Sequence, residues 1–521
     1  MGTYVNPGFD NFNSSRKNKF YVDKSMLIAL LNEKIGTDDR FLCVSRPRRF
    51  GKTMAANMIA AYYSKGCDSH EIFSDLKISK DPSYEENINK YSVIQLDMND
   101  VMKNKGKADL MSFISRRVIE ELKEEYTFLD DDVLLGVAIQ DIYKKTGDKF
   151  IFIIDEYDLI IWDNRYKDEL ECYLDFLISL FKSNASSRSI ALAYLTGIMP
   201  IVREKVQSKL NNFKEYTMLN AKNMASFMGF TEDEVRSLAK KSGMDFGELK
   251  RWYDGYNLRG LEIYSPKSVI SAIEDHECND YWIQTSSYEA VTDYISLDLD
   301  GLKKDVFTML SGGRVEVNTS FYRNTLCFDT KDDVLTYLIH IGYLSYDAYT
   351  STCFIPNNEI KDMWAHSMER TKGYQDVANM IKGSKELLEA TWDGDEKAVA
   401  KGVAKAHREA CSILQYNNEG TFQSALHLAY YYDKSYYTIV NELPAGKGFA
   451  DIAFIPYAPD VPAIIIELKK DDSVENAIDQ IKERKYPEAL EKYKDNHLLL
   501  VAISYDSKTK EYFCKIEKAE Y

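Results

Sequence analysis

The sequence reads Arg46-Pro47-Arg48-Arg49-Phe50-Gly51-Lys52-Thr53 between an apolar run, Phe41–Ser45, and an alanine- and methionine-rich segment that extends from Thr53 to Ser64. The apolar run predicts a buried strand of a parallel sheet, and the segment predicts a helix that ends near Gly66. A strand, a tight loop and a helix in this order gather backbone N–H groups and a helix N-terminus around one point. The sequence therefore predicts an anion-binding loop.

The end of this loop has the side chains that a triphosphate requires. Lys52 is placed to reach the β- and γ-phosphates of a nucleotide, and the hydroxyl of Thr53 is placed to bind Mg²⁺. The usual pattern, GxxxxGK[ST], has glycine where this chain has Arg46, so only its second half is matched. The arginines could contact phosphate, act on the nucleotide of a neighbouring subunit, or form a solvated basic turn. We expect the residues that bind ATP to include Arg46, Arg48, Arg49, Phe50, Gly51, Lys52 and Thr53.

A second motif follows a second apolar run. The run Phe150–Ile154 ends in Asp155-Glu156, where Asp155 can hold Mg²⁺ and Glu156 can polarise the attacking water. Another predicted strand, Ser92–Asp97, lies between the two motifs, a spacing that fits P-loop ATPases with an inserted strand. Thr196, which closes the next apolar run, is expected to sense the γ-phosphate. The alternative is that the acidic pair only caps a turn.

Strands and helices alternate through the first 221 residues. Predicted strands at residues 41–45, 92–97, 149–155 and 190–196 are separated by helical patterns, which is typical of an α/β fold with a mainly parallel sheet. We expect a P-loop ATPase domain at 1–221, a mostly helical middle region at 222–410, and a compact α/β module at 411–521. Residues 335–364 of the middle region could form a winged-helix-like module.

Two acidic strand ends give the C-terminal module a candidate metal site. Asp451 begins one predicted strand, and the next strand ends in Glu467-Leu468-Lys469. Alternation along a strand places Glu467 and Lys469 on one face, so Asp451 and Glu467 converge if the two strands are neighbours. Two carboxylates could then bind Mg²⁺ or Mn²⁺, and Lys469 could activate the water that attacks a phosphodiester. The alternative is a solvated strand edge, where Glu-x-Lys is common.

Composition limits the partners and the location. The 521 residues are 45% hydrophobic and 28% charged, with a net charge of −16. This charge argues against a protein that coats nucleic acid, although DNA or RNA could contact a small local site. The eight cysteines and seven histidines lack metal-binding spacing, and no apolar run approaches the ~20 residues that span a bilayer. We expect a cytoplasmic protein without membrane contact.

Five motifs together resemble the predicted AAA-ATPase-like family of bacteria. They are Tyr21-Val22-Asp23-Lys24-Ser25, the loop at 46–53, Ile154-Asp155-Glu156-Tyr157-Asp158, Leu195-Thr196-Gly197 and Trp252-Tyr253-Asp254-Gly255-Tyr256. The form RPRRFGK is normal in that family, so arginine at the first glycine position fits the resemblance. The resemblance implies an ATPase related to the STAND group, commonly paired with a C-terminal nuclease-like domain.

The C-terminal carboxylates are similar to those of the PD-(D/E)xK nuclease superfamily, which has a restriction-endonuclease-like fold. That resemblance adds three supporting residues: Gln480 and Tyr486 in the helix region after Lys469, and Glu419 ahead of the first helix of the module. Relatives often have arginine two residues before the aspartate, whereas this chain has Phe449, so one phosphate contact of the superfamily is missing.

These expectations fit two main functions. One is an ATP-binding and ATP-hydrolysing protein whose nucleotide state regulates a metal-dependent nuclease acting on DNA or RNA. The other is a STAND-like switch or scaffold whose inactive nuclease fold serves as an interaction module. A protein that binds nucleotide without detectable hydrolysis is a third alternative. A homo-oligomer or a protein client is compatible with each of them.

Overall fold

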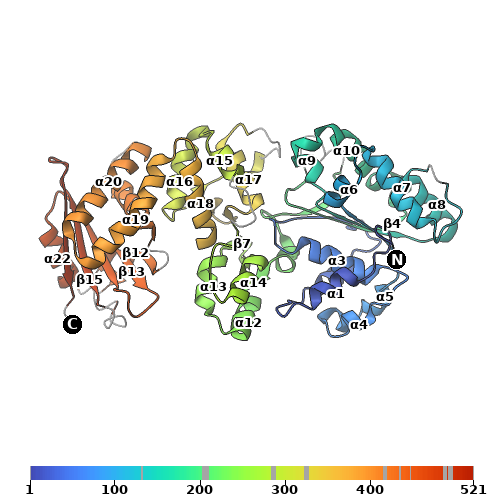
Figure 1. Ribbon diagram of the computed structural model, residues 1–521, viewed down its shortest axis with the longest axis horizontal. Helices are drawn as coiled ribbons and strands as arrows, with labels where there is room; N and C mark the ends of the chain where they lie inside the picture. The colour runs from blue at the N-terminus through green and yellow to red at the C-terminus, as the bar shows by residue number, and fades with distance from the viewer. Residues whose placement is uncertain are drawn as a thin grey trace. The chain divides into compact units, whose positions relative to one another are not determined.

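The computed structural model describes residues 2–130, 133–201, 210–282, 289–321, 328–414, 419–432, 436–445, 448–484, 490 and 497–519 (Figure 1). The chain separates into two compact units. Unit 1 comprises Met1–Thr285 and Glu316–Ile360, and unit 2 comprises Ser286–Val315 and Lys361–Tyr521. The middle region expected at residues 222–410 therefore contributes to both units, and each unit has one of the two predicted sites.

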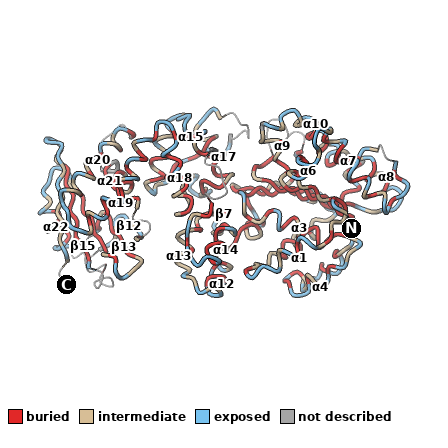
Figure 2. Tube along the Cα trace, in the orientation of Figure 1, coloured by how far each residue is buried: buried red, intermediate tan, exposed pale blue. Residues whose placement is uncertain are grey.

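Unit 1 is built on a parallel sheet of five strands. Its order is β2-β3-β4-β1-β5, and every neighbouring pair is parallel. The strands are β1 (Phe41–Ser45), β2 (Ser92–Asp97), β3 (Phe150–Asp155), β4 (Ile190–Gly197) and β5 (Lys214–Tyr216). Strands β1, β3 and β4 are buried along their whole length, as in a sheet that is covered on both faces (Figure 2). The predicted α/β fold is confirmed.

Helices cover both faces of this sheet (Figure 1). One face packs against α1 (Asp10–Arg16), α2 (Met26–Asn32), α3 (Lys52–Tyr63) and α4 (His70–Phe73). The other face packs against α6 (Met98–Asn104), α7 (Leu110–Leu122), α8 (Leu135–Thr146) and α10 (Leu170–Phe181). Shorter elements connect them: η1 (Lys77–Lys80), α5 (Tyr84–Asn87), α9 (Leu159–Trp162), η2 (Asn164–Glu169) and α11 (Asn184–Ser187).

The strand that separates the two motifs in space is β4. It pairs with β1 on one side and with β3 on the other, whereas β2 lies at the edge of the sheet. The inserted strand is therefore the one that contains Thr196, and not the one that lies between the motifs in the sequence. Because all five strands are parallel, the carboxyl ends of β1, β4 and β3 meet at one edge of the sheet.

Residues 210–282 and 316–360 complete unit 1. An antiparallel sheet of order β6-β8-β7 packs with three helices around a separate core. Its elements are η3 (Lys222–Phe227), β6 (Phe230–Thr231), α12 (Glu232–Ser242), α13 (Phe246–Tyr253), β7 (Tyr256–Leu258), β8 (Leu261–Tyr264) and α14 (Pro266–Asp275). Further along the chain, η5 (Thr319–Phe321) precedes α17 (Lys331–Ile341), the antiparallel hairpin of β10 (Ser345–Asp347) and β11 (Thr352–Phe354), and the start of α18 (Asn358–Arg370).

One carboxylate is completely buried in this part of unit 1. Glu359 is 0% exposed, and its Oε1 atom accepts hydrogen bonds from the backbone N–H groups of Tyr281 and Trp282 at 3.0 and 2.9 Å. Burial, to which the charge of Asp280 adds, raises the pKa of Glu359 to about 8. The ionised form of this side chain is therefore disfavoured in the folded chain.

Glu359 is expected to make unit 1 less stable as the pH rises. Between about pH 4.5 and 8 the folded chain keeps a proton that the unfolded chain has lost, so the free energy of unfolding falls across this window. The added slope is at most about 1.4 kcal/mol for each pH unit. Urea unfolding between about pH 5 and 8 measures it, and Glu359→Gln should gain stability over the wild type as the pH rises. A difference between the two proteins that stays constant with pH would contradict this account.

Unit 2 combines helices with a mixed sheet. The helices are α15 (Glu289–Ile295), η4 (Leu299–Gly301), α16 (Leu302–Leu310), α19 (Gln375–Asp393), α20 (Glu396–Leu414), α21 (Glu419–Ala429) and α22 (Val474–Glu483). The sheet has the order β12-β13-β14-β15-β16, in which β14 and β15 are parallel and the other pairs are antiparallel. Its strands are β12 (Tyr437–Ala445), β13 (Gly448–Pro456), β14 (Ile464–Lys470), β15 (Leu499–Tyr505) and β16 (Tyr512–Lys518). Helix α22 packs on one face of this sheet.

Several elements were not expected from the sequence. They are the edge strands β5 and β16, the small sheet of unit 1, and the two-residue strand β9 (Val315–Glu316). These strands are short or half-exposed, so they lack the continuous apolar runs of β1 and β3. Among the described residues, no helix is both long enough and apolar enough to cross a bilayer.

Candidate functional site

The loop after β1 turns sharply before α3 begins. Arg46 N donates to Gly197 O at 3.0 Å, which fixes the start of the loop to the end of β4. Gly51 precedes α3 with a φ of 87°, a left-handed conformation that favours glycine. Helix α3 has 12 residues and no side-chain cap at its N-terminus. Its first backbone N–H groups are therefore available to an anion at the loop.

Lys52 is folded back onto the loop. Its Nζ atom donates to Arg46 O at 3.0 Å and to Pro47 O at 2.8 Å, and the residue is 8% exposed. Burial lowers the pKa of Lys52, and the carboxylates near it, that of Asp155 most strongly, oppose this change. The ammonium group thus has two loop carbonyls as partners, which phosphate oxygens could replace after movement of one flexible side chain.

Two hydroxyl groups meet one carboxylate at the carboxyl edge of the sheet. Thr53 Oγ1 donates to Asp155 Oδ2 at 2.6 Å. Thr196 Oγ1 and the backbone N–H of Glu156 donate to Asp155 Oδ1, the latter at 3.0 Å. Asp155 is 1% exposed. The structure therefore brings together predicted site residues from α3, β3 and β4.

Glu156 adopts an unusual backbone conformation directly after β3. Its φ of 52° lies in the left-handed region, which costs a residue with a Cβ atom on the order of 1 kcal/mol. Burial, followed by the charges of Asp155 and Asp97, raises the pKa of Glu156. A half-buried carboxylate with raised basicity is suited to accept a proton from a water molecule.

Arg46 turns into the protein. It is 0% exposed, and its Nη1 atom donates to the backbone carbonyls of Ser45 at 2.7 Å and Tyr216 at 3.1 Å. Burial lowers the pKa of Arg46 to about 10. In this conformation the guanidinium group links the loop to the end of β5, which is not the phosphate contact that the sequence predicted for it.

The remaining loop residues differ in exposure. Arg49 donates to Tyr281 O at 3.0 Å and is partly buried, and Phe50 is 1% exposed. Arg48 is the exposed arginine of the three. The sequence left open that an arginine of the loop contacts phosphate or acts on a neighbouring subunit. Either role therefore fits Arg48 better than Arg46 or Arg49.

Two aspartates at this site were not singled out from the sequence. Asp97 ends β2 directly opposite Asp155, and burial, to which the charge of Asp155 adds, raises its pKa. Asp158 is 5% exposed and accepts hydrogen bonds from Ile198 N at 2.8 Å and Met199 N at 2.7 Å. The sequence could have indicated Asp97 as a site residue, because Asp97 ends an apolar run just as Asp155 does.

The donor set at the sheet edge suits Mg²⁺. A carboxylate oxygen of Asp155 and the hydroxyl oxygen of Thr53 lie 2.6 Å apart, close enough to serve one cation, and Mg²⁺ prefers oxygen ligands. Lys52 and the N-terminus of α3 provide the positive charge and the N–H groups that a triphosphate needs. The residues present therefore fit Mg²⁺ together with a nucleotide.

The predicted carboxylates of unit 2 lie on neighbouring strands. β13 pairs with β14, and Asp451 Oδ2 accepts a hydrogen bond from Leu468 N at 2.7 Å. Lys469 Nζ donates to Glu467 Oε1 at 3.0 Å and to Gln480 Oε1 at 2.8 Å, and Gln480 Nε2 donates to the same Glu467 oxygen. The structure thus joins Asp451, Glu467, Lys469 and Gln480, as the sequence predicted.

Glu467 has the features of a metal-binding carboxylate. The residue is 2% exposed, and its Oε2 atom is buried without a hydrogen-bond partner among the described residues. Burial and then the charge of Asp451 raise the pKa of Glu467, whereas Lys469 lowers it. A divalent cation would satisfy the second oxygen of Glu467 and offset the repulsion between the two carboxylates, so these residues fit Mg²⁺ or Mn²⁺.

Two supporting residues of this site cannot be placed in the same way. Glu419 is the first residue of α21, but its side chain lies outside the described part of the chain. Tyr486 also lies outside the described residues. Their expected roles stay predictions.

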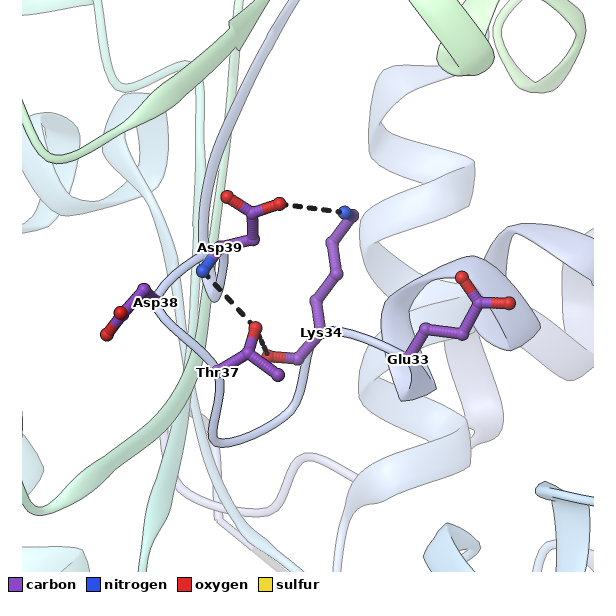
Figure 3. A pocket seen from close by; sticks show the side chains of 5 residues that line it. All are labelled: Glu33, Lys34, Thr37, Asp38 and Asp39. Carbon is purple, nitrogen blue, oxygen red and sulfur yellow. Dashed lines mark hydrogen bonds and ion pairs between the residues drawn. The ribbon is translucent and has the colours of Figure 1, made fainter.

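Two other polar clusters of unit 1 lie apart from the loop. Glu232, Asp254 and Glu262 have carboxylate oxygens within 4.8 Å of one another, and Lys250 Nζ lies 2.7, 3.5 and 2.9 Å from these residues in turn. The ammonium group of Lys250 is therefore an ion-pair partner of all three carboxylates. A surface pocket is lined by Glu33, Lys34, Thr37, Asp38 and Asp39 (Figure 3). It precedes β1, at the edge of the sheet opposite the loop.

Known proteins resemble separate parts of the chain. Residues 7–207 match a family described as predicted AAA-ATPase, and residues 417–513 match the PD-(D/E)XK nuclease superfamily. An uncharacterized protein in the vnfD 5′ region of Azotobacter chroococcum mcd 1 is 25% identical over 286 residues, which are 53% of this chain and 52% of that protein. The chain thus spans about half the length of this curated relative.

The solved structures that match parts of the chain at low TM-score include two from Aeropyrum pernix. The ORC2 protein, in ADPNP–ADP complexes, has a TM-score of 0.34 and 11% identity, covering 68% of this chain and 97% of its own. The ORC1 protein in complex with DNA has a TM-score of 0.26 and 10% identity, covering 66% of this chain and 93% of its own.

The sheet order, the site geometry and the family matches agree on both parts of the chain. The parallel sheet places Thr53, Asp155 and Thr196 together within the first matched segment, and Asp451, Glu467 and Lys469 lie together within the second. The chain thus carries one segment that matches the predicted AAA-ATPase family, at residues 7–207, and one that matches the PD-(D/E)XK nuclease superfamily, at residues 417–513.

Proposed function

We propose that the edge of the unit 1 sheet binds Mg²⁺-ATP and hydrolyses it. The observation that carries this proposal is the 2.6 Å hydrogen bond from Thr53 Oγ1 to Asp155 Oδ2, with the Lys52 ammonium on the same loop. A hydroxyl, a carboxylate and a lysine in this arrangement are the groups that hold a metal-bound triphosphate. We retain residues 1–221 as the ATPase domain, 222–410 as the middle region and 411–521 as the nuclease-like domain.

Each residue has a chemical role in this proposal. Lys52 exchanges its loop carbonyls for β- and γ-phosphate oxygens, and the first N–H groups of α3 bind the same phosphates. Bound Mg²⁺ supplies positive charge to the phosphate oxygens, and Thr53 and Asp155 are its protein ligands. Glu156 accepts a proton from the water that attacks the γ-phosphate. Thr196, bonded to Asp155, senses whether that phosphate is present.

The C-terminal domain is proposed to be a metal-dependent nuclease under the control of the ATPase. Asp451 and Glu467 bind Mg²⁺ or Mn²⁺, and Lys469, held by Gln480, positions the water that attacks a phosphodiester of DNA or RNA. The unpartnered buried oxygen of Glu467 supports catalysis over a purely structural module. Regulation by nucleotide state is proposed because both domains belong to one chain.

A switch or scaffold is the second candidate. The hydrogen bonds that Glu467 receives from Lys469 and Gln480 favour it, because they engage one oxygen of the key carboxylate within the protein itself. In that case the nucleotide site would act as in STAND-like proteins, and the nuclease fold would bind a protein client or a second copy of the chain without cleaving nucleic acid.

Replacing Glu156 with glutamine is expected to separate ATP binding from hydrolysis. Turnover should fall at least about 100-fold, because the group that accepts the proton of water is lost. The Kd for Mg²⁺-ATP should stay within about threefold of the wild-type value, because the ligands of phosphate and metal remain. Phosphate release and calorimetry on the full chain measure the two quantities. Equal turnover in the variant and the wild type would remove Glu156 from the mechanism, and no turnover in the wild type would favour a protein that only binds nucleotide.

A further inference from the structure

The phosphate loop is held from outside by residues that lie far along the chain in unit 1. Gly229 N donates to Phe50 O at 3.1 Å, and Arg49 donates to Tyr281 O at 3.0 Å. The ring of Tyr256 meets that of Phe50 edge to face, with centroids 5.3 Å apart. We call the four residues that contact the loop, together with Glu359, the collar: Gly229, Tyr256, Tyr281, Gly342 and Glu359.

The fourth contact is a close approach of the Gly342 backbone to the ring of Pro47. Gly342 follows α17 with a φ of 89°, and a Cβ atom at this position would lie 2.8 Å from Cβ and Cγ of Pro47. Such a distance leaves no room for a side chain. Glycine is therefore required at Gly342 both for its conformation and for its contact with the loop.

Hydrogen bonds tie the collar residues to one another. Tyr256 OH donates to Gly342 O at 2.8 Å, so one side chain contacts Phe50 and also holds the turn that packs on Pro47. Glu359 accepts the N–H groups of Tyr281 and Trp282, and thereby fixes the segment whose carbonyl binds Arg49. The buried collar residues thus form two hydrogen-bonded pairs, Tyr256 with Gly342 and Tyr281 with Glu359, and Gly229 is bonded to the loop itself.

The loop needs this support because part of its backbone is strained. Arg49 has a φ of 70° and Gly51 a φ of 87°, and the left-handed region is unfavourable for arginine. A residue in such a conformation persists only when its surroundings fix it. The collar contacts fall on Pro47, Arg49 and Phe50, directly around the strained residue.

We propose that Tyr256 and Glu359 are positioning residues of the nucleotide site, which hold the phosphate loop in its binding conformation. This inference rests on the proposed function of that loop. It assigns a role to the motif Trp252–Tyr256 and to the segment around α17 and α18, and it extends the nucleotide site beyond residue 221 to residue 359. Neither residue touches the phosphates in this account.

The effect should appear in affinity and not in the chemical step. Without the collar contacts the free loop relaxes, and ATP binding must restore its conformation, which raises Kd. Asp155 and Glu156 are outside the collar, so turnover of the bound nucleotide should persist. A higher KM with an unchanged kcat is therefore the signature of this role.

The test uses the full chain with Mg²⁺-ATP and compares two tyrosines. Tyr256→Leu removes the ring contact and the hydroxyl bond, and Kd should rise about tenfold, which corresponds to about 1.4 kcal/mol. Tyr62→Leu is the matched control, because Tyr62 OH donates to Tyr84 O at 2.8 Å and its ring meets that of Phe73 edge to face at 5.5 Å, away from the loop. It should lower the melting temperature similarly and leave Kd unchanged.

Two further variants test the inference if Tyr256→Leu does not fold. Tyr256→Phe keeps the ring and loses only the bond to Gly342 O, so Kd should rise about threefold. Glu359→Ala removes the oxygen that accepts the N–H groups of Tyr281 and Trp282, and it should raise Kd by at least a similar factor. If the wild type binds Mg²⁺-ATP and the Tyr256 and Glu359 variants bind it with the same Kd, this inference is overturned and the proposed function is not. Equal increases of Kd in the Tyr256 and Tyr62 variants overturn this inference as well. A wild-type chain that does not bind Mg²⁺-ATP overturns the proposed function and this inference together.

Discussion

Replacing Lys52 with alanine is expected to weaken Mg²⁺-ATP binding by at least about 100-fold. Charge-assisted hydrogen bonds contribute about 1.5–3 kcal/mol each, and a loss of about 3 kcal/mol corresponds to a factor of about 100 in Kd. Lys52 is 8% exposed, and the only hydrogen-bond acceptors of its Nζ atom in the described structure are the loop carbonyls of Arg46 and Pro47. Calorimetric titration of the full chain with Mg²⁺-ATP measures the effect.

Lys105 provides the matched control for this experiment. It is also a poorly exposed lysine of unit 1, and its Nζ atom binds Ala108 O at 3.1 Å and Glu169 at 2.6 Å, outside the phosphate loop. Lys105→Ala should therefore cost stability without changing nucleotide affinity. If both alanine variants bind Mg²⁺-ATP as tightly as the wild type, the loop is not the nucleotide site.

Replacing Glu467 with alanine is expected to abolish metal-dependent cleavage of nucleic acid, with a loss of at least about 100-fold. The substitution removes one of two carboxylates that hold the cation, and a bound cation stabilises the transition state by several kcal/mol. It also leaves Lys469 without its 3.0 Å partner. Nicking of supercoiled DNA and cleavage of single-stranded DNA and RNA, each with Mg²⁺ or Mn²⁺, measure the loss.

Two comparisons make this result specific. Glu517→Ala removes a carboxylate of β16 that pairs with Lys482 of α22 at 2.6 Å and with Lys515 at 3.3 Å, and it should leave cleavage unchanged. Assays with ATP, with ADP and without nucleotide should give different cleavage rates if the ATPase regulates the nuclease. Equal cleavage rates in the three assays would contradict regulation of the nuclease by the ATPase. If the wild type cleaves none of the substrates, the result would favour the switch or scaffold function.

Residue patterns predicted the parts of the fold that bury continuous apolar runs. The predicted strand at residues 41–45 is β1, and that at 92–97 is β2, with the same bounds. Parallel strands covered on both faces consist mostly of apolar residues, so their ends are visible in the sequence. Because parallel strands end at one edge, the meeting of Thr53 with Asp155 could be predicted as well.

Other features depend on contacts that no local pattern encodes. The order of the strands places β4, and not β2, between the two motifs, and only pairing across the sheet decides this order. Arg46 turns inward because the carbonyls of Ser45 and Tyr216 are available to it, although a basic residue in a loop usually predicts exposure. The collar joins residues about 180–295 positions apart, such as Phe50 with Gly229 and Pro47 with Gly342.

The most direct test of the nucleotide site is an experimental structure of the full chain with Mg²⁺ and a non-hydrolysable ATP analogue. We expect Lys52 Nζ to leave Arg46 O and Pro47 O for phosphate oxygens, and Mg²⁺ to bind beside Thr53 and Asp155. A nucleotide bound elsewhere, or Lys52 still bonded to the loop carbonyls beside a bound triphosphate, would contradict this expectation.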